Sequence, residues 1–277
     1  MRVNKQWLRQ GVLVLTGVLL LGSTLAQAEE EFPLRAKHPA ITPITTAELA
    51  AVYDQAIIVD SRDAMEFKVI HMKGAHNFLV AKMQEADLSG LRPKDGPAPL
   101  VFYCNGITCE KSYDASEKAA KWGFANVKVY DAGIFTWAKE QPERTLIFDQ
   151  PQTAETIKTS LISKEKLTEK MLAPAEFIAK SKDTSYTIID IRGTNERKEI
   201  PIKLPKLKVM PLDTMVKLLE EKSPAIPSKG LLIIDIVGKQ VSWVQYYLEQ
   251  QGATDYFFLK GGGAEWKKEG FNETGGK

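Results

Sequence analysis

One seven-residue pattern occurs twice in this chain and constrains its fold more than any other feature. Residues 60–66 read Asp-x-Arg-x-x-x-Glu, and residues 190–196 read the same, 130 positions later. Each copy begins where a short apolar run rich in β-branched residues ends, at 56–60 and at 186–190. Such runs are typical of buried parallel strands. The pattern therefore predicts two repeated α/β domains of ordinary size.

The repeat continues in the segments that follow. In the first half, the sequence predicts strands at 99–104 and 127–130 and a helix at 112–122. The second half repeats the two strands at 231–235 and 256–259. Because strands alternate with helices, we expect in each domain a mainly parallel sheet flanked by helices.

The spacing changes by two residues within the repeat. Cys104 aligns with Asp235 at an offset of 131, whereas Trp137 aligns with Trp266 at an offset of 129. The first half therefore contains two extra residues between these positions. We expect them in the segment directly after Cys104.

The N-terminus has the features of a targeting segment. Three basic residues precede or flank an apolar run at 11–21, and Ala26-Gln27-Ala28 offers small residues at the two positions that a signal peptidase reads. We expect a signal peptide at 1–28, cleaved during export to the periplasm. The alternative is an uncleaved anchor, and the membrane would be a partner only through this segment.

Cleavage after Ala28 changes the net charge from +2 to −1, because the removed segment carries three basic and no acidic residues. A near-neutral surface gives no electrostatic basis for binding nucleic acid, so we expect no such partner. In the remaining chain we expect one domain at 40–148, a linker at 149–166 that is rich in Thr, Gln and Lys, and a second domain at 167–275.

The motifs, taken in order, resemble the rhodanese domain. The first half resembles it through Asp60-x-Arg62-x-x-x-Glu66-Phe67, His71-x-x-Gly74-Ala75, a strand ending in Cys104, Gly123-Phe124 and Gly133-x-x-x-Trp137. The second half resembles it through Asp190, Arg192, Glu196, Gly252, Gly261-Gly262 and Trp266. The resemblance implies two tandem rhodanese-like domains, a sulfurtransferase activity and no cofactor.

Cys104 is the candidate catalytic residue. It stands at the carboxyl end of a predicted parallel strand and precedes a helix, where α/β folds place their ligands. Backbone N–H groups and the helix dipole at such a position bind anions and lower the pKa of a thiol from about 8.5. The alternative is an inert, half-buried thiol.

The resemblance implies a two-step reaction at Cys104. The thiolate takes the outer sulfur of a donor such as thiosulfate or polysulfide and becomes a persulfide, which then gives the sulfur to a thiol or cyanide. The expected partners are a small sulfur-containing anion and such an acceptor, with a sulfur-accepting protein as a further candidate.

The loop after Cys104 departs from the family pattern, because it is about two residues longer and contains no Arg. We expect it to bind substrate through Asn105, Gly106, Ile107, Thr108, Cys109, Glu110 and Lys111, which is its only cation. Cys109 has three interpretations: a resolving thiol that attacks a persulfide or sulfenate on Cys104, a disulfide partner that locks the loop, or a packed neighbour.

The second half has Asp235 where the nucleophile would be. Since a carboxylate cannot carry a persulfide, this half resembles the inactive repeat of tandem rhodaneses, with a structural role. Asp60 and Arg62 have counterparts in this half at the same spacing, Asp190 and Arg192. We therefore interpret Asp60 and Arg62 as a supporting ion pair that holds the end of a strand.

Three functions follow from these observations. The first is a sulfurtransferase that uses Cys104. The second is a non-catalytic rhodanese-like binding module, and the third is a thiol redox protein that cycles a Cys104–Cys109 disulfide. We expect no metal site, because His71 and His76 lack further ligands beyond the two cysteines.

Overall fold

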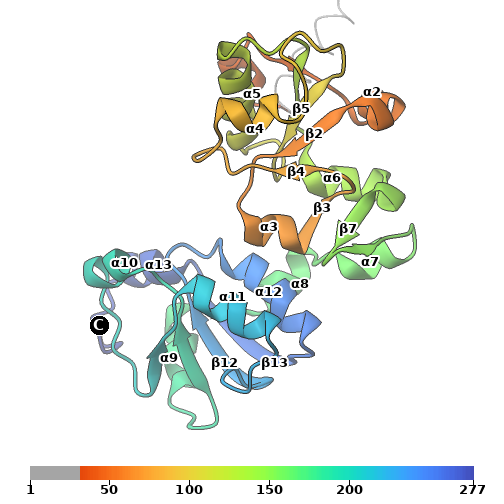
Figure 1. Ribbon diagram of the computed structural model, residues 1–277. Helices are drawn as coiled ribbons and strands as arrows, with labels where there is room; N and C mark the ends of the chain where they lie inside the picture. The colour runs from red at the N-terminus through yellow and green to blue at the C-terminus, as the bar shows by residue number, and fades with distance from the viewer. Residues whose placement is uncertain (1–31) are drawn as a thin grey trace, which may run out of the picture. The chain divides into compact units, whose positions relative to one another are not determined.

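The computed structural model describes residues 32–277 (Figure 1). The expected signal peptide at 1–28 lies outside the described residues. These residues form two compact units: a first unit of residues 32–62 and 74–140, and a second unit of residues 63–73 and 141–277. Within the described part of the chain, no helix has both the length and the apolar character needed to cross a bilayer.

The first unit is built on a parallel sheet with the strand order β1-β6-β5-β2-β4. Its strands are β1 (Thr42–Pro43), β2 (Ile57–Asp60), β4 (His76–Asn77), β5 (Leu100–Tyr103) and β6 (Val127–Tyr130). Its helices are η1 (Arg35–Lys37), α2 (Thr46–Val52), η2 (Tyr53–Gln55), α4 (Glu85–Ser89), α5 (Lys111–Lys121) and α6 (Gly133–Glu140). The central strand β5 is buried throughout, as its continuous apolar sequence predicts.

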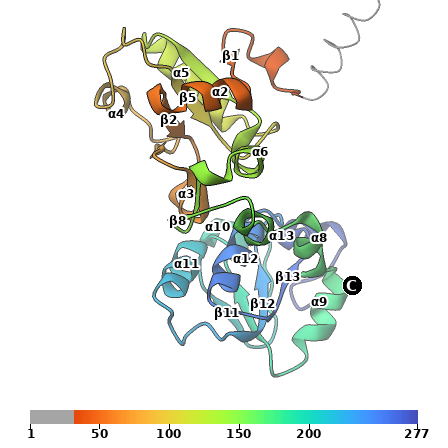
Figure 2. The ribbon, with the colours of Figure 1, turned by 90° about the vertical axis from the view of Figure 1, so that its right-hand side faces the viewer.

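Helices cover both faces of this sheet. On one face, Phe102 of β5 packs with Leu88 of α4 and Ala115 of α5, and α5 lies beside β5 (Figures 1 and 2). On the other face, Trp137 of α6 packs edge-on against Tyr130 of β6. The expected α/β fold with a parallel sheet flanked by helices is therefore confirmed.

Thr45 explains where α2 begins. Its hydroxyl accepts the Glu48 N–H at 3.3 Å, and the Glu48 carboxylate accepts the Thr45 N–H at 2.9 Å. This reciprocal capping box satisfies two of the N–H groups that a helix start leaves without partners. Thr45 is therefore the N-cap of α2.

The second unit contains a parallel sheet with the order β11-β10-β12-β13-β9. Its strands are β9 (Met171–Leu172), β10 (Thr187–Asp190), β11 (Leu207–Val209), β12 (Lys229–Ile234) and β13 (Asp255–Leu259). Its helices are α3 (Ala64–Val69), η3 (Pro142–Arg144), α7 (Thr156–Ser160), α8 (Lys164–Glu169), α9 (Pro174–Ser181), α10 (Thr194–Glu199), α11 (Leu212–Glu220), α12 (Val241–Gln250) and α13 (Gly262–Lys268). Helices α11 and α12 lie side by side (Figure 2). Taken from β4 in the first unit and from β11 in the second, the two sheets have matching strand orders.

The second unit also contains a small antiparallel sheet that the sequence did not predict. Its strands are β3 (Ile70–Met72), β7 (Thr145–Ile147) and β8 (Gln150–Pro151). The expected boundary between 148 and 149 cuts through the β7–β8 hairpin, and the segment 63–73 groups with the second unit. The expected linker at 149–166 contains β8, α7 and the start of α8. Of the two pairings in this sheet, β3 with β7 joins distant segments and β7 with β8 is a hairpin, and a polar composition reveals neither.

The two extra residues expected after Cys104 are divided between loop and helix. The loop between β5 and α5 has seven residues, 104–110, and the corresponding loop between β12 and α12 has six, 235–240. The second extra residue lies in the helix, since α5 has 11 residues and α12 has 10.

Candidate functional site

Cys104 lies directly after β5, at the carboxyl end of the sheet in the first unit. It is 1% exposed, and its carbonyl accepts the N–H of Ile134 at 2.9 Å. Helix α5 begins at Lys111, at the other end of the loop. The structure therefore places Cys104 at the strand end and before a helix, where the sequence predicted it.

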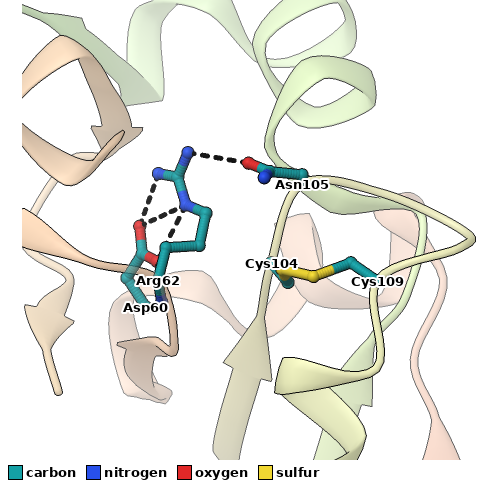
Figure 3. Close-up of a disulfide and its surroundings, with 5 residues drawn as sticks. All are labelled: Asp60, Arg62, Cys104, Asn105 and Cys109. Atoms are coloured by element: carbon teal, nitrogen blue, oxygen red, sulfur yellow. Dashed lines mark hydrogen bonds and ion pairs between the residues drawn. A yellow bond between two sulfur atoms is a disulfide. The ribbon is translucent and has the colours of Figure 1, made fainter. Parts of the chain in front are cut away.

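The two cysteines are joined in a disulfide, with a Cα–Cα distance of 6.2 Å (Figure 3). Between them the chain makes a turn in which the Cys109 N–H donates to the Gly106 carbonyl at 2.9 Å. Of the three interpretations of Cys109, the structure shows the disulfide partner. In this oxidised form Cys104 has no thiolate, so any chemistry that needs a nucleophile at this position must follow reduction.

Cys109 differs from Cys104 in its exposure to solvent. Cys104 is buried, whereas Cys109 is partly exposed, as are its loop neighbours Asn105 and Gly106. Ile107, Thr108 and Glu110 are exposed. A reagent in solution therefore meets the Cys109 end of the disulfide before the Cys104 end.

The backbone of Gly133 lies directly against the backbone of the loop after Cys104. A Cβ atom at this position would lie 2.3 Å from the Gly106 nitrogen and 2.5 Å from the Asn105 carbonyl carbon. The φ angle of Gly133 is +77°, in the region that favours glycine. Any other residue here would displace the backbone of the Cys104 loop. In the sequence Gly133 stood out only as part of a family motif, because the residues next to it do not show which backbone segment packs against it.

Asp60 and Arg62 form a fully buried pair beside this loop. Arg62 Nε donates to Asp60 Oδ1 at 2.9 Å, and Arg62 Nη2 donates to Asp60 Oδ2 at 2.6 Å. The remaining terminal nitrogen, Nη1, donates to Asn105 Oδ1 at 3.1 Å (Figure 3). The pair thus fixes the first residue of the loop after Cys104.

The same pair occurs in the second unit with one different contact. Arg192 Nε and Nη2 donate to the two carboxylate oxygens of Asp190 at 2.8 and 2.7 Å. Arg192 Nη1 donates to the Ile200 carbonyl at 2.7 Å and so does not reach a loop side chain as Arg62 does. Two buried ion pairs of the same geometry, one in a unit without a cysteine, agree with a supporting role.

A second ionic cluster, which no sequence pattern predicted, includes Tyr113 near the start of α5. Arg35 donates to both carboxylate oxygens of Asp131 at 2.8 and 3.0 Å, and the Tyr113 hydroxyl donates to the same carboxylate at 2.7 Å. Burial and the Asp131 carboxylate raise the pKa of Tyr113 above its ordinary value. Nearby along the chain, exposed Lys37 pairs with Glu110 of the loop at 3.1 Å. These residues come from three distant segments, and no local pattern connects them.

The loop of the second unit is closed by Asp235. Its Oδ1 accepts the Gly238 N–H at 2.7 Å, and its Oδ2 accepts the Gln240 N–H at 3.0 Å. Burial raises the pKa of the Asp235 carboxyl above its ordinary value, and these N–H groups oppose part of that shift. The backbone N–H groups of this loop therefore point at the position that corresponds to Cys104.

Neither unit shows a metal centre in the part of the chain that the structure describes. No group of three or more His, Cys, Asp or Glu side chains in residues 32–277 is placed to hold an ion. His71, which the sequence analysis considered, lies in β3, with Nδ1 at 2.8 Å from the Phe67 carbonyl and its ring stacked on Phe67.

A comparison with protein families gives a match in the part of the chain that contains Cys104. Residues 45–140 match the model of the rhodanese-like domain, and a search of curated proteins gives no match. Among solved structures, the BH2092 protein from Bacillus halodurans is 25% identical over 47% of this chain and 88% of that chain, with a TM-score of 0.35.

Two further solved structures are similar to this chain. A thiosulfate sulfurtransferase from Pseudomonas aeruginosa is 18% identical over 86% of this chain and 44% of that chain, with a TM-score of 0.38. A human single-domain sulfurtransferase, TSTD1, is 20% identical over 36% of this chain and 96% of that chain, with a TM-score of 0.31. With TM-scores this low, the structural similarities add no support beyond the match to the family model. That match includes Asp60, Arg62, Cys104 and Cys109, so residues 45–140 are similar to the rhodanese-like domain.

Proposed function

We propose that this protein is a sulfurtransferase in which Cys104 carries sulfur as a persulfide. The observation that supports this most directly is the position of Cys104 within the rhodanese-like domain. It stands at the carboxyl end of the buried central strand β5, seven residues before the helix α5. A thiolate formed there lies where parallel α/β sheets bind their ligands.

The proposed reaction begins with reduction of the disulfide. The Cys104 thiolate then attacks the outer sulfur of thiosulfate, the sulfur–sulfur bond of the donor breaks, and sulfite leaves with the bonding electron pair. A polysulfide reacts in the same way and leaves one sulfur shorter. In the second step an acceptor thiol or cyanide attacks the persulfide and regenerates the Cys104 thiolate.

We also propose that the protein acts in the periplasm, after cleavage of a signal peptide at 1–28. A compartment that permits disulfides agrees with the bond between Cys104 and Cys109. The working protein then needs a thiol reductant in that compartment.

For the second unit we propose a rhodanese-like domain of the inactive type, which makes the chain a tandem arrangement. The support is the matching strand order of the two sheets and the Asp235 carboxylate in place of a thiol. Its proposed role is structural.

A second candidate function is favoured by the disulfide itself. A protein that carries no sulfur and only cycles between the Cys104–Cys109 disulfide and two thiols would have the same oxidised structure. The two functions differ in what the reduced protein takes up, because only a sulfurtransferase retains a sulfur atom from the donor.

The test is the intact mass of the protein after treatment with thiosulfate or polysulfide. The Cys109→Ser variant, which cannot form the disulfide, should gain the mass of one sulfur atom, and reductant should remove it. Cys104→Ser should gain none. If Cys104→Ser gains sulfur as readily as Cys109→Ser, the proposed role of Cys104 is wrong, and if neither variant gains sulfur the redox function is favoured.

A further inference from the structure

The second thiol of the loop is held in place rather than merely nearby in sequence. The disulfide shows that Cys109 Sγ reaches Cys104 Sγ while both chain segments keep their hydrogen bonds. The Cys109 N–H is held by the Gly106 carbonyl at 2.9 Å, and the next residue, Glu110, already accepts the Asp114 N–H of α5 at 2.9 Å. Cys109 is thus fixed between a turn and the start of a helix.

A group fixed in this way competes strongly with any acceptor from solution. Reactions between well-oriented groups of one molecule have effective molarities of roughly 10⁵–10⁸ M. An external thiol would have to approach Cys104, which is 1% exposed, whereas Cys109 is already beside it. A persulfide on Cys104 would therefore meet Cys109 first.

We infer that Cys109 is the acceptor in the proposed reaction, and that the protein reduces sulfane sulfur to hydrosulfide. This inference rests on the proposed function, because it requires a persulfide on Cys104. The Cys109 thiolate attacks Sγ of Cys104, a bond between the two Sγ atoms forms, and the bond from Cys104 Sγ to the outer sulfur breaks. The outer sulfur leaves as HS⁻ with the bonding electron pair. The outer sulfur is reduced, and the two cysteines are oxidised to the disulfide.

Attack on the Sγ of Cys104 is the single step that gives the observed disulfide. Attack on the outer sulfur would move the persulfide to Cys109 and leave both residues without a mutual bond. Attack on Cys104 Sγ gives the bond that the structure contains. The disulfide is then the product of each turnover, and two equivalents of a thiol reductant, or one of a dithiol, restore the two thiols.

The second unit lacks such a pair of thiols, since its loop at 235–240 contains no cysteine. There the carboxylate of Asp235 takes the N–H groups of Gly238 and Gln240 instead. The loop that holds two thiols is the longer one, with seven residues rather than six.

The experiment is a single turnover of the full chain with thiosulfate and without an added acceptor. The protein is fully reduced, freed of reductant under anaerobic conditions and given one equivalent of thiosulfate. We expect about one hydrosulfide per protein and a disulfide in peptide 95–111, which contains both cysteines. Cys109→Ser and Cys109→Ala should keep the sulfur as a persulfide and release at least tenfold less hydrosulfide. Ser89→Ala, an exposed change in α4 outside this loop, should behave as the unchanged protein.

Two outcomes overturn different claims. A stable persulfide on the unchanged protein, or hydrosulfide release from the Cys109 variants at the rate of the unchanged protein, overturns the role of Cys109 and leaves the proposed function standing. Failure of both Cys109 variants to take up sulfur from thiosulfate and from polysulfide overturns the proposed function, and the inference with it.

Discussion

The buried pair of Asp60 and Arg62 can be tested by removing one charge without changing the volume of the side chain. In Asp60→Asn, Arg62 keeps its guanidinium charge at a position with no solvent exposure and loses a carboxylate that accepts its Nε and Nη2 hydrogen bonds at 2.9 and 2.6 Å. The same carboxylate also accepts a second contact from Nε at 3.2 Å and the Arg62 backbone N–H at 3.0 Å. Asn has one accepting oxygen in place of two, and that oxygen carries no charge.

The expected cost is large because the remaining charge has nowhere to be solvated. Breaking a buried pair by removing one partner costs about 3–5 kcal/mol. Urea slopes of about 1–3 kcal/mol per molar then predict that the unfolding midpoint falls by on the order of 2 M. Asp190→Asn offers a matched control, since Arg192 makes the same two contacts at 2.8 and 2.7 Å with 0% and 1% side-chain exposure.

The assay is urea unfolding combined with hydrogen exchange, so that each unit is followed by its own strands. Asp60→Asn should increase exchange in β2 and β5, and Asp190→Asn should do so in β10 and β12. A change below about 1 kcal/mol in both variants would refute the structural interpretation. A change in Asp60→Asn without one in Asp190→Asn would show that the contact with Asn105, which only Arg62 makes, matters more than the pair itself.

Three further predictions concern the two loops. Gly133→Ala should lower the free energy of unfolding by about 1–3 kcal/mol more than Gly123→Ala. Both glycines have a positive φ, but only the new Cβ at position 133 would clash with backbone, at 2.3 Å. Urea unfolding of both variants measures the difference. Because burial raises the pKa of the Asp235 carboxyl, the folded chain binds its proton more tightly than the unfolded chain does. The stability of the protein should therefore fall relative to that of Asp235→Asn as the pH rises from about 4. A constant difference between the urea midpoints of the two proteins would contradict this. Glutathione should attack the sulfur of Cys109, which is partly exposed, rather than that of Cys104, which is 1% exposed. With iodoacetamide present, glutathione should therefore remain on Cys109 and the alkyl group should be on Cys104. Fragmentation of peptide 95–111 distinguishes this product from the reverse one.

The parts of the fold that the sequence predicted are those with a strong local pattern. The strands next to Asp60, Cys104, Asp190 and Asp235 are short apolar runs, the strand at 127–130 contains one charged residue, Lys128, and the structure places a strand at each. The helix expected at 112–122 is α5, shifted by one residue. Because both faces of a parallel sheet are buried, its strands are restricted mainly to apolar residues, and this restriction allows them to be predicted from the sequence.

The parts that could not be predicted depend on contacts between distant segments. Strand β3 pairs with β7 across more than seventy residues, and each has only three residues. Asn105 was expected in a substrate-binding loop, but its contact with Arg62 depends on how a guanidinium is oriented by Asp60. The disulfide remained one of three interpretations because spacing along a loop does not give the direction of a side chain.

The two loops are closed by different chemistry at corresponding positions, and this difference bears on function. In the second unit, Asp235 occupies the N–H groups of its own loop through hydrogen bonds that no reductant can break. In the first unit, Cys104 is occupied by Cys109 through a bond that thiols do break. The chain has no third cysteine to act in place of either residue. If sulfur chemistry depends on Cys104, its rate must follow the fraction of the protein in which this one disulfide is reduced, and the protein without reductant should be inactive.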